Sequence, residues 1–255
     1  MNFVNLLKYW LGIRPKWSKC RHASCWDGAN AKERRMNMLS PKMPEGVFRS
    51  YLKAMKARGC DTAHLILTNK ADGEYAGYSP WGNCAPFASG KADAARLMKK
   101  RIVQLRKKGF GIVLWLVTDD SKDWAKTIFA QPDAFCRALA DNGLLREAST
   151  VVLGLEMDEY GSRADWKKLR EALNNVYRGR VGVHHTSGRC PFADLGDIIF
   201  DQLDPAKASV LTVANSVRKL KATGKAVVGF EYARSPNRVL AQAALDAGAI
   251  GCGNW

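Results

Sequence analysis

Short apolar runs alternate along the chain with longer stretches in which apolar residues recur every three or four positions. The first pattern is typical of strands buried on both faces, and the second of helices that cover a sheet. The repeat of roughly 30 residues predicts an α/β protein with a parallel sheet. We expect eight strands, over residues 35–40, 62–69, 111–118, 150–156, 181–185, 198–202, 226–231 and 249–254.

Helices are expected between these strands, over residues 45–58, 91–108, 123–142, 163–177, 207–223 and 237–247. Glycine follows five helical patterns directly, where it supplies a left-handed cap: Gly59, Gly109, Gly143, Gly224 and Gly248. Eight such units predict one closed (β/α)8 TIM barrel. An open doubly wound sheet would share the alternation but usually carries a GxGxxG phosphate loop after its first strand, and none follows Ser40.

The length and composition fit one domain, because 255 residues that are 47% hydrophobic can bury a large single core. We assign residues 34–255 to the barrel, whose last strand is not followed by a helix. Residues 1–33 are expected to form an N-terminal extension, with a short amphipathic helix that packs on the barrel. The apolar stretch near the start is too short and too interrupted for a transmembrane segment, and it lacks the features of a secretory signal.

Charge and cysteine content restrict the partners and cofactors. The 40 lysines and arginines exceed the 24 acidic residues by 16, which favours an anionic partner. Most of this excess falls on predicted helix faces, and no pattern typical of a nucleic-acid module is present, so nucleic acid is not expected. The seven cysteines are scattered, which predicts buried, reduced thiols and no metal site. This cysteine usage favours the cytoplasm or release without a signal, and the sequence leaves localisation and oligomeric state open.

Two predicted strands end on a glutamate, Glu156 and Glu231. Alternation along residues 150–156 assigns Val152, Gly154 and Glu156 to the inner face, and the same count in 226–231 assigns Val227, Gly229 and Glu231 to the inner face. The carboxyl ends of barrel strands open onto one face. Two carboxylates at that opening are the minimum equipment for cleaving a glycosidic bond.

With these residues the chain resembles the large clan of retaining (β/α)8-barrel glycoside hydrolases. Asp158-Glu159-Tyr160-Gly161 is similar to the Asn-Glu-Tyr-Gly string of several families, with aspartate in place of asparagine, and residues 229–232 are similar to their seventh-strand segment. The resemblance covers residues 35–255 and implies an acid/base glutamate at the fourth strand and the nucleophile Glu231 at the seventh. The motif favours Glu159 as acid/base, whereas the alternation favours Glu156, and both stay open.

A looser resemblance to chitinase-type barrels rests on residues 154–158 and on Phe200-Asp201. It would put the general acid on Tyr160, which cannot do that work.

Further polar and aromatic residues fall at or near predicted strand ends, where they would bind substrate. They are Asn69, Trp81, Asp119, Asp158, His184, His185, Asp201, Gln202, Tyr232 and Trp255. Among them His184 has inward parity, and Trp81 belongs to a loop rich in aromatic residues.

The expected function is therefore glycosidic bond cleavage by retaining double displacement in a poly- or oligosaccharide, without a cofactor. The positive charge points to an anionic glycan. Two alternatives remain: a catalytically inactive glycan-binding or structural barrel, and a metal-dependent lyase or isomerase. The latter would use Glu156, Asp158, His184, Asp201 and Glu231 as ligands.

Overall fold

The computed structural model describes residues 22–23, 38–57, 59–68, 92–118, 122–186, 188–232 and 237–254. Within them, strands and helices alternate along the chain, and every paired strand lies parallel to its neighbours. None of the described helices has the length and hydropathy needed to span a membrane.

A curled parallel sheet of seven strands runs in chain order through the described residues. Its strands are β2 (Thr62–Ile66), β3 (Gly111–Val117), β4 (Thr150–Gly154), β5 (Arg180–His184), β6 (Ile198–Gln202), β7 (Ala226–Glu231) and β8 (Gly251–Asn254). These agree with seven of the expected strands to within a few residues. Closure of the sheet rests on the two-residue strand β1 (His22–Ala23), which pairs with both β2 and β8.

The strand expected over residues 35–40 is wrong for its described part, because residues 38–40 form a turn. The buried guanidinium of Arg101 explains this, since it donates hydrogen bonds to the backbone carbonyls of Met38, Ser40 and Met43. These carbonyls therefore accept hydrogen bonds from a side chain and not from the N–H groups of a neighbouring strand. Strand β1 lies instead within residues 1–33, and the rest of that segment lies outside the described residues, so the domain boundary stays a prediction.

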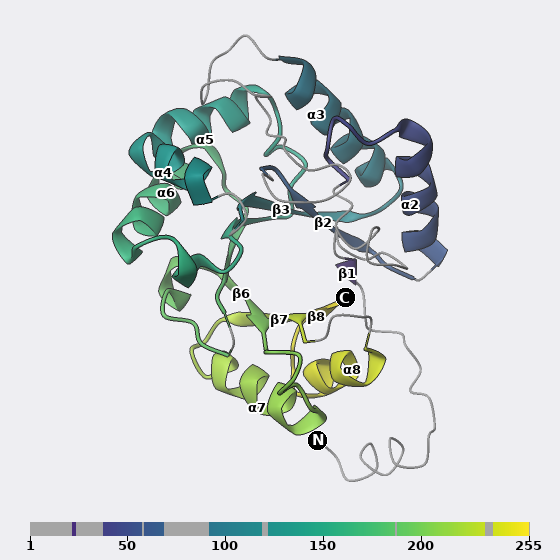
Figure 1. The fold of residues 1–255 in the computed structure, drawn as a ribbon, viewed down its shortest axis with the longest axis vertical. Coiled ribbons are helices and arrows are strands. Elements are labelled where there is room, and N and C mark those ends of the chain that lie inside the picture. The colour runs from purple at the N-terminus through teal and green to yellow at the C-terminus, as the bar shows by residue number, and fades with distance from the viewer. Residues whose placement is uncertain are drawn as a thin grey trace.

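Helices surround the sheet on its outer side (Figure 1). They are α2 (Glu45–Ala57), α3 (Ala92–Lys107), α4 (Lys122–Ala130), α5 (Pro132–Asp141), α6 (Arg163–Val176), α7 (Val210–Lys221) and α8 (Arg238–Asp246). The single helix expected over 123–142 is two helices, because Pro132 has no N–H to continue α4 and instead occupies the first turn of α5. All five glycines expected to end helices have positive φ.

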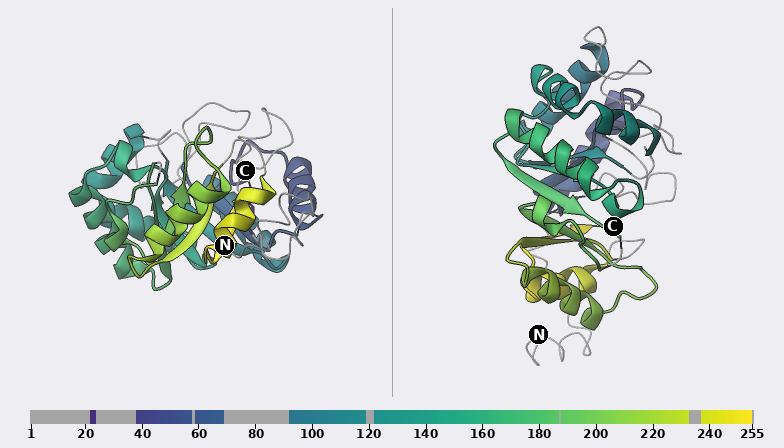
Figure 2. Two further views of the ribbon diagram at one scale, coloured as in Figure 1. Left: turned by 90° about the horizontal axis from the view of Figure 1, so that it is seen from below. Right: turned by 90° about the vertical axis from the view of Figure 1, so that its left-hand side faces the viewer.

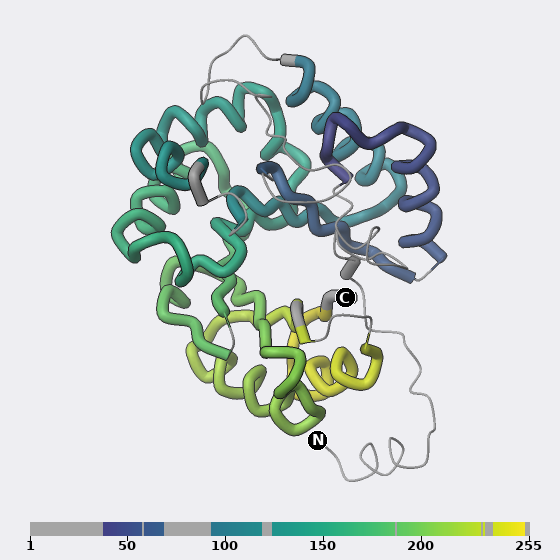
Figure 3. Tube along the Cα trace, viewed as in Figure 1, coloured from purple at the N-terminus to yellow at the C-terminus, as the bar shows by residue number. Residues whose placement is uncertain are grey.

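Two apolar layers hold the fold together. One lies between the sheet and the helices. The Cα trace in Figure 3 shows how the chain from α2 to α8 surrounds the sheet. The other fills the interior of the sheet, with Ile66, Val113, Trp115, Val152, Leu155, Ile198, Phe200, Val228 and Phe230. Figure 2 shows the helices stacked along the outer side, with α7 beside α8. The interior is thus a packed core, on which a site at the strand ends can rest.

The described cysteines fit the expectation of unpaired thiols. Cys60, Cys136, Cys190 and Cys252 form no disulfide among the described residues, and all but Cys190 are buried. The other three cysteines lie outside those residues.

Arg101→Ala tests the buried guanidinium. We expect it to lower the free energy of unfolding by about 3 kcal/mol, because three buried carbonyls lose a charged donor. Urea titration measures the effect. Arg96→Ala is the control on the same helix, since Arg96 is exposed and pairs only with the exposed Asp93 among the described residues; it should cost less than about 1 kcal/mol. Equal losses for both variants would contradict the role of Arg101.

Candidate active site at the carboxyl ends of the strands

Glu156 follows β4 in a left-handed backbone conformation, with φ 49° and ψ 50°. Among the described residues it is the only one other than glycine with positive φ. For an L-residue this conformation costs on the order of 1–3 kcal/mol and persists only where neighbouring groups impose it. Such strain is concentrated at functional sites, and it marks Glu156 as a candidate site residue.

Side chains from the next two strands hold Glu156. Its N–H donates to Nδ1 of His184 at the end of β5 (2.9 Å), and one of its carboxylate oxygens, Oε1, accepts from Nε2 of Gln202 at the end of β6 (2.7 Å). The backbone and the side chain of Glu156 are thus fixed by different strands. This carboxylate sits at the opening of the sheet, partly exposed.

The indole of Trp166 in α6 supports the same segment from the helix side. Its Nε1 donates to the carbonyl of Met157 (2.9 Å), and its ring is fully buried. A Cβ on Gly154 would come within 2.5 Å of this ring, so only glycine fits there. The sequence-based assignment of Gly154 to the inner face is therefore wrong: it faces Trp166, and Leu155, expected on the helix side, lies in the interior core.

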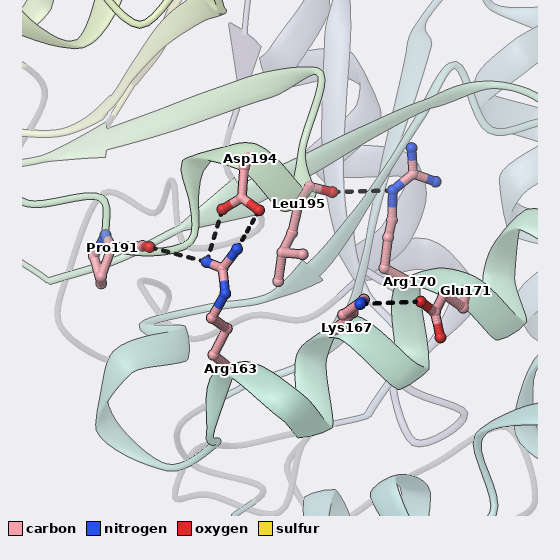
Figure 4. Close-up of polar contacts among 7 residues, drawn as sticks. All are labelled: Arg163, Lys167, Arg170, Glu171, Pro191, Asp194 and Leu195. Atoms are coloured by element: carbon pink, nitrogen blue, oxygen red, sulfur yellow. Dashed lines mark hydrogen bonds and ion pairs between the residues drawn. The ribbon is translucent and has the colours of Figure 1, made fainter.

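Asp158 joins this turn to the loop that follows β5. Its carboxylate accepts from the N–H of Thr186 (2.8 Å) and from the Thr186 hydroxyl (2.7 Å). The far end of that loop is tied to α6, because Arg163 donates two hydrogen bonds to Asp194, and Arg170 binds the carbonyl of Leu195 (Figure 4). The predicted site residue Asp158 thus has a structural partner on each oxygen, and its loop has a fixed position.

Strand β7 carries an irregularity next to Glu231. Asp201 pairs with Gly229, but the next residue of β6, Gln202, pairs with Glu231, so Phe230 is the extra residue of a bulge. Glu231 consequently stands in register with the residue whose amide binds Glu156. The alternation read from the sequence is wrong for this strand, because Val228 and Phe230 lie in the interior core and a Cβ on Gly229 would meet Tyr232 and Ala244.

Aromatic rings close the interior beneath this opening. His64, Trp115, His184, Phe200 and Phe230 come from five strands, and their ring centroids lie 4.7–5.9 Å apart in eight pairs. Trp115 Nε1 also donates to Nδ1 of His64 (3.2 Å). The site therefore has a rigid apolar floor, which favours specific contacts over solvent access.

His184 is neutral. Its Nδ1 accepts a hydrogen bond and so carries no proton, and complete burial, with a smaller effect of His185, holds the pKa of His184 well below its ordinary value. The ring proton is therefore on Nε2, for which the described residues supply no acceptor. The inward parity expected for His184 agrees with its ring contacts.

Three predicted site residues lie on the helix side of the sheet. Asp201 is 2% exposed and accepts from Ser216 Oγ (2.9 Å) and from the Tyr232 hydroxyl (2.8 Å). His185 is also buried, with Nδ1 3.1 Å from Cys190 Sγ, and burial lowers the pKa of His185 to about 4. Asp201, Tyr232 and His185 therefore do not line the opening. Asp201 is thus kept apart from the other ligands named for the alternative of a metal-dependent lyase or isomerase.

Other predicted residues fall outside what the structure describes. These are Asn69, Trp81, Asp119, Trp255 and the side chain of Glu231. Glu159, the other candidate acid/base, is exposed and lies in the 3₁₀ turn Met157–Glu159. Two supporting residues, Thr186 and Trp166, were not anticipated as part of the site. Thr186 is polar and follows a strand end, and this position could have indicated a site residue. Trp166 has the sequence pattern of an ordinary core residue of a helix, so nothing in the sequence indicates its role.

Comparison with solved structures adds to this geometry. A GH53 catalytic domain from Ignisphaera aggregans matches with a TM-score of 0.59 and 14% identity, over 94% of this chain and 85% of its own. A GH113 β-1,4-mannanase matches with a TM-score of 0.57 and 12% identity, over 94% and 89%. The chain has the fold of these glycoside hydrolases. It also spans 51% of a candidate glycoside hydrolase from Bacteroides vulgatus, with a TM-score of 0.65 and 16% identity.

The glycoside hydrolase fold is shared at identities of 11–16%, so the likeness concerns architecture and not chemistry. No protein-family model matches the sequence, and comparison with curated proteins gives no match. The comparisons therefore show a fold shared with glycoside hydrolases and assign no activity.

Asp201→Asn tests the buried carboxyl. Burial raises the pKa of Asp201 from 3.8 to about 6. Between these values the folded state binds more protons than the unfolded state, so this group's contribution to stability falls as pH rises. As pH rises from 4 to 7, the free energy of unfolding of the variant should therefore increase relative to that of the wild type by roughly 3 kcal/mol. Urea titration at each pH measures this difference. The exposed Glu171→Gln should follow the wild type, and a pH-independent difference for Asp201→Asn would contradict the assignment.

Proposed function

We propose that this protein is a glycosidase that cleaves a poly- or oligosaccharide by retaining double displacement, with Glu156 as acid/base and Glu231 as nucleophile. The observation that carries the proposal is the register of the two strands. Glu231 is paired with Gln202, and Gln202 binds the carboxylate of Glu156. Two glutamates that end strands of one parallel sheet, in a fold shared with glycoside hydrolases, fit this reaction.

In the first step Glu231 attacks the anomeric carbon while Glu156 gives its proton to the leaving oxygen, and a covalent glycosyl-enzyme forms. In the second step Glu156 takes a proton from water, the water oxygen bonds to the anomeric carbon, and Glu231 leaves. Retention calls for carboxyl groups about 5–5.5 Å apart, whereas inversion calls for about 6.5–9.5 Å. Gln202 would keep the acid oriented through both steps because it donates to one carboxyl oxygen.

Glu156 is preferred over Glu159 as acid/base for a physical reason. General acid catalysis requires a carboxyl group held at a fixed distance from the leaving oxygen. Glu156 is partly buried and is held by its backbone and by its side chain, whereas the side chain of Glu159 is exposed. The remaining expectations for substrate-binding residues, an anionic substrate among them, stay proposals; Asp158 would act by ordering the loop after β5.

Three matched variants test the assignment: Glu156→Gln, Glu231→Gln and Glu159→Gln. We expect the first two to lower kcat by about 10³ or more and the third by less than about tenfold. Reducing-end release from β-1,4-mannan, the substrate named for one structural neighbour, and from a panel of acidic polysaccharides gives the rates. Proton NMR of the first product anomer reports retention or inversion.

A fully active Glu231→Gln protein would rule out this nucleophile. Loss of activity in Glu159→Gln with little change in Glu156→Gln would transfer the acid/base role to Glu159. Binding of a polysaccharide without cleavage by the wild type would favour the alternative of an inactive glycan-binding barrel.

His184→Phe tests whether His184 positions Glu156. Phenylalanine keeps a ring in the aromatic floor but removes the acceptor for the Glu156 N–H. Leaving a buried N–H unsatisfied should lower the free energy of unfolding by about 1–3 kcal/mol. We expect kcat to fall by about tenfold or more with little change in KM, because the acid and not the binding surface is displaced. A change confined to KM would contradict the positioning role.

A further inference from the structure

A hollow lies between α2 and α3, on the outside of the fold. Its volume of about 610 Å³ falls in the range of about 300–1,000 Å³ that is usual for ligand sites. Its floor is apolar, formed by Phe48 and Leu52. Its walls carry five exposed cations: Arg49, Lys53, Lys56, Lys107 and Lys108.

The four lysines of this basic groove form no ion pair with any described residue, and the arginine binds only Glu45 there (3.2 Å). The charges of the four lysines are therefore not neutralised by ion pairs with the described part of the chain. A favourable interaction with the helix dipole accounts for cations in a last turn, such as Lys56 and Lys107. It does not account for Arg49, in the first half of α2, or for Lys53, which precedes the last turn. On α2 the cations follow one another every three or four residues, which lines them up along one wall.

The basic groove is remote from Glu156. The helix α2 ends just before β2 begins, and α3 ends just before β3 begins, so Lys56, Lys107 and Lys108 lie near the amino ends of the strands. Glu156 follows the carboxyl end of β4, at the opposite end of the sheet. Any ligand of the groove is therefore held away from the proposed site of cleavage.

The chemistry of the groove distinguishes among anionic polymers. Single-stranded nucleic acid is usually held by stacking of its bases on aromatic rings. Here Phe48 and Phe110 are buried, and the ammonium of Lys56 covers the Phe110 ring at 4.5 Å. Binding to a membrane surface is strengthened by apolar side chains that insert. The large exposed apolar residues of the described part, Leu211, Val239 and Ile250, lie outside α2 and α3.

We propose that the basic groove binds a chain of an acidic polysaccharide, with its exposed cations contacting the carboxylates of that chain. The choice of a glycan rests on the proposed function, while the charge complementarity rests on the groove alone. The groove would hold the protein on the same polymer that the opening at the other end of the sheet cleaves. Binding through two sites on one polymer raises the effective concentration of substrate at the cleaving site.

Matched triple variants test this proposal. Lys53→Gln, Lys56→Gln and Lys107→Gln together remove three charges from the groove. The control removes three charges from exposed positions on α4, α6 and α7: Lys126→Gln, Lys168→Gln and Lys219→Gln. Both proteins should unfold at the wild-type temperature, because all six side chains are exposed.

Isothermal titration calorimetry measures binding of polygalacturonate, of its methyl ester, of an oligodeoxynucleotide of matched charge, and of vesicles that contain phosphatidylserine. We expect the wild type to bind polygalacturonate and not the neutral ester. The groove variant should bind about tenfold more weakly and with a shallower salt dependence, since fewer ions are released. The control should change by less than about twofold.

Equal loss in both triple variants would overturn the proposal, because net charge alone would then explain binding. Tighter groove-dependent binding of the oligodeoxynucleotide or of the vesicles would also overturn it, as would failure of the wild type to bind polygalacturonate at low salt. Glu156→Gln separates the groove from catalysis: it should bind polygalacturonate like the wild type even when hydrolysis is lost. Hydrolysis that survives in a protein with no groove-dependent binding would reject the groove and keep the proposed function.

Discussion

The hydrogen bond from the Glu156 N–H to Nδ1 of His184 fixes the geometry on which the candidate site depends. This bond requires an imidazole that carries no proton on Nδ1. Complete burial keeps the imidazole neutral because it holds the pKa of His184 well below its ordinary value. It also stabilises a backbone conformation that glutamate disfavours. A charged or displaced imidazole would release Glu156 toward an ordinary extended strand end, from which its carboxylate could not meet Gln202 in the same way.

This local geometry depends in turn on the packing on both sides of the sheet. Inside, the rings of Trp115 and Phe230 contact His184 and keep it dry. Outside, Trp166 occupies the space left by Gly154 and binds the Met157 carbonyl. The turn after β4 is therefore held between two rigid layers, which is the kind of support that a positioned catalytic acid needs.

The sequence predicted the architecture well and the orientation of individual side chains poorly. The alternation of apolar runs with amphipathic stretches located β2 to β8, and five glycines marked helix ends, because these signals are local. The first strand failed because its carbonyls bind Arg101, more than 60 positions away in the chain for two of the three contacts. In β4 the alternation holds for Val151, Val152 and Leu153 and fails only at Gly154 and Leu155, whereas in β7 it fails over residues 227–230. Strands that are apolar on both faces carry no periodic signal that could show this.

The register of Glu231 depends on the bulge in β7. Counting residues two by two through β7 placed Val227 inside, yet the interior core contains Val228 and Phe230. The bulge adds one residue before the strand end, and Glu231 therefore pairs with Gln202. In a regular strand Gln202 would pair with Phe230 instead. A bulge depends on the neighbouring strand and on Tyr232 packing under Gly229, which no local pattern in residues 226–231 reveals. The proposed pairing of Glu231 with Glu156 thus rests on one irregularity of the sheet rather than on strict alternation.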